Sequence, residues 1–150
     1  IRPRCGRRTA ASTTSPSSGA WVTPVELPQL HALLVNPGVH VPTGPVFSAL
    51  ASRGNPPMPR DIPAFTSAED CAAWLREQRN DLEAPAIGAA PGIERVLSDL
   101  RSSRQALLAR MSGSGATCFA LYPTKNAAHM AAYEIGAEHP DWWCSAVTLA

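Results

Sequence analysis

The spacing of apolar residues divides the chain into short segments of two kinds. Compact apolar runs at 31–35, 106–111 and 117–122, each followed by residues that favour turns, are typical of buried strands. The closing segment from residue 141, "DWWCSAVTLA", is also rich in residues that favour strands. Between these runs lie segments in which apolar residues recur three and four positions apart, and this spacing predicts helices.

Four helices are predicted, and each has a recognisable start. Thr43, Ser67 and Thr124 stand directly before helical segments, where a side-chain oxygen accepts hydrogen bonds from free backbone N–H groups. Pro91-Gly92 introduces the most regular helix, expected over 91–104. Its apolar face, at i, i+3, i+4 and i+7, consists of Ile93, Val96, Leu97 and Leu100. The helix after Thr124 carries a face of Ala128, Ala131, Ala132 and Ile135.

The order of these elements predicts the fold class. A strand and helices precede two consecutive strands, a helix and a final strand, which is a split βαβ arrangement of the ferredoxin-like kind. We therefore expect an α+β sandwich with helices on one face of a mostly antiparallel sheet. Residues 52–63 hold four prolines and a glycine, so we expect a surface loop there.

Composition narrows the class of protein without indicating a function. A chain of 150 residues, 45% of them apolar, is long enough for one domain with its own core. It offers no run of 18 apolar residues as a membrane span, and its net charge of +1 gives no reason to expect nucleic acid or an acidic membrane as a partner. The four histidines are scattered, so we expect them to be solvated or to cap helices. The cysteines are far apart, so we expect reduced thiols in a cytoplasmic protein and neither a zinc site nor a disulfide framework; they are Cys5, Cys71, Cys118 and Cys144.

Residues 1–20 differ from the rest of the chain. They contain four arginines and no acidic residue, whereas residues 21–150 carry all 12 acidic residues. We expect this tail to be disordered or foreign to the domain, which then spans residues 21–150. An Arg-, Ser-, Pro- and Ala-rich run is also what a GC-rich gene encodes when it is read out of frame, so a frameshift is a hypothesis for its origin.

The Gly/Ser stretch at 112–116 is the candidate binding loop. A tight turn between two strands is its simplest interpretation. It does not fit a Walker A loop, because no lysine follows the glycines, or a nucleophile elbow, because Ser114 is flanked directly by glycines and precedes a strand. The alternative is a cradle for an anion, in which Gly113 and Gly115 take positive φ and successive backbone N–H groups converge on a phosphate.

The stretch "ARMSGSGATCFALY" at 109–122 closely resembles the third motif of the GHMP kinases. Three further stretches resemble the same family and occur in family order: "LLVNPGVHVPTGPVF" at 33–47, "NDLEAPA" at 80–86, and the helix at 91–104. The resemblance covers residues 21–150 and implies the C-terminal domain of a GHMP kinase. It is closest to a member that acts on a cytidine diphosphate-linked methylerythritol in non-mevalonate isoprenoid biosynthesis.

The resemblance implies roles for individual residues. Thr43 would contact the substrate hydroxyl, and Phe47 would stack on the cytosine of the substrate. The residues that would support the main phosphate loop and line the ATP site are Ser112, Gly113, Ser114, Gly115 and Ala116. The residues themselves allow other interpretations, because Thr43 suits a plain N-cap and Phe47 with Leu50 suits a core stripe. ATP and Mg²⁺ would serve the complete enzyme.

The same resemblance implies that parts of a kinase are missing. The family's main glycine-rich phosphate loop and catalytic aspartate do not occur in residues 1–150, so no catalytic or metal-binding residue is assigned. We therefore expect the chain to need an N-terminal kinase domain, to be inactive alone, and to expose an apolar face where that domain packs. The alternatives are another GHMP kinase, such as homoserine kinase, and a non-enzymatic ferredoxin-like domain that binds a small molecule.

Overall fold

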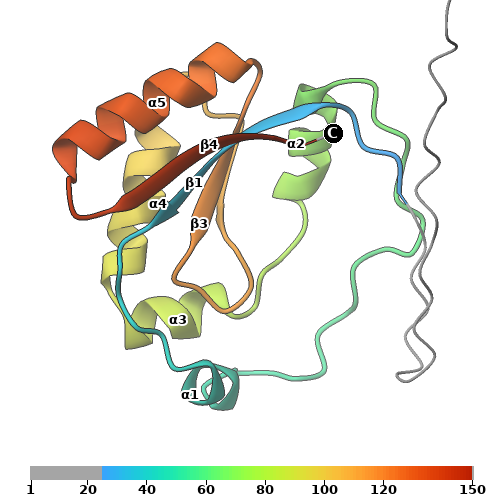
Figure 1. Cartoon of the computed structure of the whole chain (residues 1–150). Coiled ribbons are helices and arrows are strands. Elements are labelled where there is room, and N and C mark those ends of the chain that lie inside the picture. The colour runs from blue at the N-terminus through green and yellow to red at the C-terminus, as the bar shows by residue number, and fades with distance from the viewer. Residues whose placement is uncertain (1–24, 150) are drawn as a thin grey trace, which may run out of the picture.

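The computed structural model describes residues 25–149, and Figure 1 shows their arrangement. In chain order the elements are β1 (Leu30–Asn36), α1 (Thr43–Ser48), α2 (Ala68–Arg76), α3 (Glu83–Ala89), α4 (Gly92–Ser102), β2 (Leu108–Met111), β3 (Cys118–Tyr122), α5 (Lys125–Glu138) and β4 (Trp143–Leu149). Each predicted strand and helix is present within a few residues of its expected bounds. The expectations for residues 1–20 lie outside the described residues.

The strands form one sheet in the order β2-β3-β1-β4, and every neighbouring pair is antiparallel. The central strand β1 pairs His31 with Tyr122 of β3 on one side and with Thr148 of β4 on the other. It follows that β1 and β2 run parallel with β3 between them, and that β3 and β4 run parallel with β1 between them. These are two split βαβ units, so the predicted α+β, ferredoxin-like fold class is confirmed.

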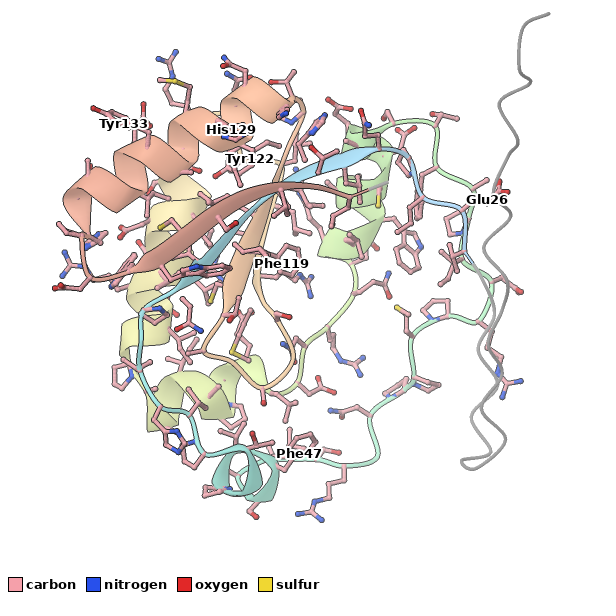
Figure 2. The ribbon with its side chains drawn as sticks, viewed as in Figure 1. Glu26, Phe47, Phe119, Tyr122, His129 and Tyr133 are labelled. Atoms are coloured by element: carbon pink, nitrogen blue, oxygen red, sulfur yellow. The ribbon has the colours of Figure 1, made fainter. Side chains whose placement is uncertain are left out.

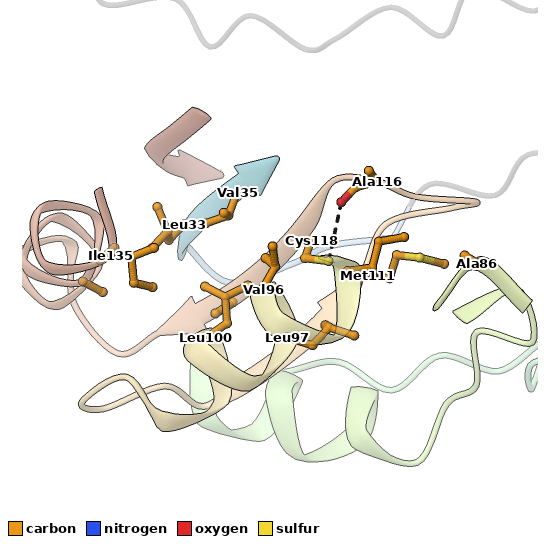
Figure 3. Close-up of a cluster of buried hydrophobic side chains, with 14 of the residues drawn as sticks. Leu33, Val35, Ala86, Val96, Leu97, Leu100, Met111, Ala116, Cys118 and Ile135 are labelled. Atoms are coloured by element: carbon orange, nitrogen blue, oxygen red, sulfur yellow. Dashed lines mark hydrogen bonds between the residues drawn. The ribbon is translucent and has the colours of Figure 1, made fainter. Parts of the chain in front are cut away.

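The main core lies between one face of the sheet and helices α4 and α5 (Figure 3). Alternate residues of a strand point to the same face, so Leu33 and Val35 of β1 face this core together with Cys118 of β3. The predicted apolar face of α4 is completely buried against them, at 0% exposure for Ile93, Val96, Leu97 and Leu100. Burial of each such side chain contributes roughly 1.5–3 kcal/mol of transfer free energy. The regular apolar spacing of α4 is the spacing that places all four side chains in the core.

A smaller core covers part of the opposite face and corrects one expectation. Ala68, Cys71 and Ala72 of α2 are buried there against Leu30 and Leu121 of the sheet. Figure 1 shows α4 and α5 together on one side of the strands and α2 on the other. The helices therefore do not all lie on one face of the sheet. The apolar residues of α2 pack against the sheet residues that point away from α4 and α5.

Two of the three predicted N-caps are confirmed. The Ser67 hydroxyl accepts a hydrogen bond from the Asp70 N–H (3.1 Å), and the Thr124 hydroxyl accepts one from the Ala127 N–H (3.1 Å). Thr43 is different, because α1 begins at Thr43 itself and Pro42 is the N-cap residue, without a side-chain cap. Proline already supplies the extended backbone that precedes a helix, which leaves the Thr43 hydroxyl free for other contacts.

The remaining expectations concern loops and cysteines. Residues 52–63 contain neither helix nor strand, as predicted. Cys71 and Cys118 are buried free thiols, and Cys144 is a partly buried free thiol. Burial raises the pKa of the Cys118 thiol to about 12. Among residues 25–149, no helix has both the length and the hydropathy that crossing a bilayer requires.

Candidate functional site

The loop between β2 and β3, Ser112–Ala116, needs its glycines. Gly113 and Gly115 have φ of 56° and 87°, in the region that side-chain-bearing residues seldom adopt. A Cβ on Gly115 would also lie 2.9 Å from the Met111 sulfur and 3.1 Å from Cδ1 of the buried Ile93. The loop therefore lies directly over the core, and glycine at position 115 allows that close approach.

Only part of the loop backbone is used internally. The Ser112 N–H donates to the Thr117 carbonyl (2.9 Å), and the Gly115 N–H donates to the Ser112 carbonyl (3.1 Å). The N–H groups of Gly113 and Ser114 find no acceptor among residues 25–149. The loop is thus both a hydrogen-bonded turn and a backbone with two neighbouring donors available to an anion, so the two interpretations of the sequence are compatible.

Asn80 holds this loop in place. Its Nδ2 donates to the carbonyls of Met111 (3.1 Å) and Gly113 (2.9 Å), while its Oδ1 accepts from the Leu82 N–H (3.2 Å). Glu83, at the start of α3, accepts the Met111 N–H at Oε2 (3.3 Å). On sequence alone, Asn80 was only part of the resembling stretch "NDLEAPA" and was assigned no role. Its carboxamide, which can donate and accept at once, was the signal that could have identified it.

The structure brings Thr43 to the same loop. Its hydroxyl lies 3.5 Å from the Ser114 hydroxyl, although the two residues are 71 positions apart in the sequence. Figure 1 shows α1 and α3 at the end of the sheet where β2 turns into β3. The first turn of α1 and the Gly/Ser loop therefore form two sides of one site.

Phe47 lies one helical turn beyond Thr43 and does not belong to the core. Its side chain is 47% exposed, whereas the neighbouring Val46 is 1% exposed and anchors α1. Figure 2 shows Phe47 on α1, well away from the aromatic residues of the sheet. Phe47 and Leu50 line an open pocket of about 540 Å³ that Arg79 and Asn80 border on the other side.

The charged side chains of this pocket, Arg79 and Asp81, are held together by hydrogen bonds. The Arg79 Nε donates to Asp81 (3.0 Å), and the Asn55 Nδ2 donates to the same carboxylate (2.9 Å). These hydrogen bonds hold the pKa of Asp81 below its ordinary value, so the carboxylate is ionised at neutral pH. Arg79 also donates to the Pro56 carbonyl (2.9 Å), and the pocket wall is therefore tied to the 52–63 loop.

The site suits phosphate oxygens better than a metal ion. Within residues 25–149, no three His, Cys, Asp or Glu side chains gather as a ligand set. Mg²⁺ prefers carboxylate oxygens, yet Glu83 already accepts from Met111 and Arg101 (both 3.3 Å), and Asp81 accepts from Arg79 and Asn55. The loop itself offers hydroxyls and N–H groups, which are donors that an ATP phosphate accepts. The described residues thus fit part of an ATP site and do not supply a magnesium site.

Comparison with known proteins identifies the family of this chain. The family model described as "GHMP kinases C terminal" matches residues 62–141. This match spans α2 to α5 and includes both Asn80 and the Gly/Ser loop. The chain belongs to the GHMP kinase family, of which it carries the C-terminal domain.

Curated relatives within the family share one name. The chain is 54% identical over 132 residues to the 4-diphosphocytidyl-2-C-methyl-D-erythritol kinase of Dinoroseobacter shibae, which covers 87% of this chain and 46% of the relative. It is 56% identical over 127 residues to the kinase of the same name from Cereibacter sphaeroides, covering 83% of this chain and 46% of that protein. The chain thus spans about half the length of the curated relatives that it matches.

Solved structures give the same result for the fold. A crystal structure of a 4-(cytidine 5'-diphospho)-2C-methyl-D-erythritol kinase matches with a TM-score of 0.61 at 28% identity, over 85% of this chain and 46% of that one. A homoserine kinase from Cytophaga hutchinsonii matches with a TM-score of 0.53 at 21% identity, over 84% of this chain and 44% of that one. The second likeness, at this identity, supports the fold alone.

Proposed function

We propose that this chain is the C-terminal part of an ATP-dependent kinase that phosphorylates the 2-hydroxyl of 4-diphosphocytidyl-2-C-methyl-D-erythritol, in non-mevalonate isoprenoid biosynthesis. The contact between Thr43 and Ser114 carries this proposal. It joins the residue proposed to contact the substrate hydroxyl with the loop proposed to line the ATP site. The names of the relatives support the choice of substrate.

In this proposal each part of the site has a separate task. Phe47 presents an exposed ring on which the cytosine stacks, an interaction worth roughly 1–3 kcal/mol. Thr43 orients the accepting hydroxyl beside the loop. Ser112, Gly113, Ser114, Gly115 and Ala116 place backbone donors beneath the phosphates of ATP. Because phosphoryl transfer depends mainly on positioning and charge stabilisation, such a backbone contribution is chemically sufficient for this half of the site.

The proposal also requires an N-terminal kinase domain as a partner. The sheet face that α2 leaves open supports such a partner, because Leu34 and the directly opposite Phe119 are only partly buried there. Trp143, on the same face of β4, is 55% exposed. We propose that the partner domain covers this end of the sheet and supplies the main phosphate loop, the catalytic base and the ligands for Mg²⁺. The 150-residue chain alone should then show no ATP-dependent turnover.

A chimaera tests the function directly. Residues 25–150 would be joined to the N-terminal half of the Dinoroseobacter shibae relative, and phosphorylation would be followed with the cytidine diphosphate substrate and with homoserine. Turnover of the cytidine diphosphate substrate alone is the expected result. Turnover of homoserine would favour another GHMP kinase. A chimaera that folds and binds neither substrate would favour the non-enzymatic binding domain.

Phe47→Ala in that chimaera tests the substrate site. The change should raise the KM for the cytidine substrate by roughly ten-fold or more, within the range expected for one stacked base, and should leave the KM for ATP unchanged. Because Phe47 is already half exposed, the variant should fold as well as the parent. Tyr133→Ala is the matched control, since this α5 tyrosine is 75% exposed and lies outside the site. An equal effect of both changes would argue against stacking on Phe47.

A further inference from the structure

Three arginines surround an open pocket at the outer edge of β2, where the proposed function assigns no ligand. The pocket has a volume of about 260 Å³, and Arg76 of α2, Arg101 of α4 and Arg110 of β2 line it. These residues come from three separate elements. The fold thus gathers guanidinium groups that are far apart in the sequence.

The backbone at this edge leaves one open position. In an antiparallel strand, alternate residues direct their N–H and C=O groups away from the neighbouring strand. Arg76 donates to the Leu107 carbonyl (3.1 Å), and side chains of Asn80 and Glu83 bind the Met111 carbonyl and N–H. Ala109 lies between these two capped positions and lines the pocket. Ala109 directs its N–H and its C=O outward by this alternation, and no side chain among residues 25–149 bonds to either group.

The charges around the pocket leave donors in excess. Glu83 is the one carboxylate among the lining residues, and its two oxygens already accept from Arg101 and Met111. The Arg110 Nη2 donates a hydrogen bond to the Arg76 carbonyl (2.9 Å), and Arg101 also forms an ion pair with Glu94 (3.6 Å). A guanidinium carries five N–H donors, so each arginine keeps donors that these contacts do not use. The Ala109 C=O, which points outward with the N–H, is then the one lining acceptor without a described partner, and the lining keeps a net positive charge.

We propose that this pocket binds a phosphate group, held by Arg76, Arg101, Arg110 and the Ala109 N–H. Guanidinium groups match phosphate oxygens in geometry and charge, and donors from three directions suit a tetrahedral anion. The pocket is smaller than the roughly 300–1,000 Å³ of sites for drug-sized ligands, so it suits a compact anion better than a whole nucleotide. The source of the phosphate group is either free inorganic phosphate or a small phosphate monoester.

Titration of the full 150-residue chain by ¹H–¹⁵N NMR tests this site without any kinase activity. Inorganic phosphate and glycerol 3-phosphate would be added in separate experiments at constant ionic strength, balanced with sodium chloride. Saturable shifts are expected at the Ala109 amide and at the Nε–H signals of the three pocket arginines. A similar Kd for both ligands would show that the phosphate group suffices, and a tighter monoester would identify that source.

Charge-matched variants separate a built site from general attraction. Arg101→Gln and Arg110→Gln should each weaken binding about ten-fold, the scale of one lost charge-assisted hydrogen bond. Arg95→Gln removes the same charge from an exposed position of α4 outside the pocket and should leave the Kd unchanged. Shifts that do not saturate, that avoid Ala109, or that weaken equally in Arg95→Gln would overturn the proposal. Unchanged signals elsewhere in each spectrum would verify that the variants fold.

Discussion

Replacing Gly115 by alanine tests whether the Gly/Ser loop is shaped by contact with the core. At φ 87°, the strained backbone of an alanine would lower the free energy of unfolding by about 1–2 kcal/mol. Its Cβ would also meet the Met111 sulfur at 2.9 Å and Ile93 Cδ1 at 3.1 Å. The thioether of Met111 can move aside, whereas the fully buried Ile93 has little room, so overpacking adds about 1–3 kcal/mol. The expected loss in the free energy of unfolding is therefore about 2–5 kcal/mol.

A second variant isolates the contact from the backbone strain. Gly113 also has positive φ, 56°, but a Cβ there would meet nothing within 4 Å. Gly113→Ala should therefore cost only the backbone part, about 1–2 kcal/mol. Gly136→Ala, in the last turn of α5 and with open space around it, should stabilise the domain by at most about 0.5–1 kcal/mol, so this control should change the free energy of unfolding in the opposite direction.

Urea unfolding followed by far-UV circular dichroism would give these free energies, provided that all variants share one m-value. The reasoning requires Gly115→Ala to cost more than Gly113→Ala by about 1–3 kcal/mol. If Gly113→Ala were equally or more destabilising, close packing over Met111 and Ile93 would not be what requires glycine at position 115.

Three further predictions concern the Asn80 hydrogen bonds, the Asp99–His139 pair and the Cys118 thiol. Asn80→Ala should cost about 1–3 kcal/mol and speed amide exchange in the Gly/Ser loop, because two backbone carbonyls lose their donor, while the exposed Asn126→Ala should do neither. Asp99→Ala should cost about 1–3 kcal/mol in thermal or urea unfolding, since it removes the 2.8 Å partner of the His139 ring; a neutral result would refute a structural role for that pair. The free energy of unfolding should fall as pH rises from 9 toward 12, because the unfolded Cys118 thiol releases its proton while the folded thiol, with a pKa of about 12, keeps it. Cys118→Ala should make that decline shallower, and an unchanged slope between pH 9 and 12 would contradict the raised pKa.

The elements that could be predicted from the sequence are those with strong local signals. The i, i+3, i+4, i+7 stripe of α4 identified residues that are all completely buried, and the caps at Ser67 and Thr124 form as expected. Thr43 is not a cap because Pro42, one position earlier, takes that place. A cap assignment from residue type alone cannot distinguish these neighbours.

The parts of the site that could not be predicted depend on contacts between distant segments. The hydrogen bonds from Asn80 to the Gly/Ser loop join residues more than 30 positions apart, and no periodicity records them. Phe47 has the spacing of a core residue, yet its side chain is half exposed, and it is the neighbouring Val46 that is buried in the core. His139 does more than cap α5, since its ring stacks on Trp142 and binds Asp99 of α4. In each case the contacts of the residue depend on tertiary packing, and the neighbouring sequence does not determine them.

The position of β1 has a consequence for how the chain is made. Among the four strands of this sheet β1 comes first in the sequence, but it is central in the sheet, and it pairs Leu30 with Leu149 and His31 with Tyr122. Contacts so distant in sequence slow folding, because a long loop must close before they form. While residues 37–142 are being translated, β1 therefore lacks the partner strand β4, and the sheet can close only after β4 has been translated. Any ribosome stalled upstream of Trp143 would hold a chain in which β1 has an open edge for aggregation or for chaperone capture.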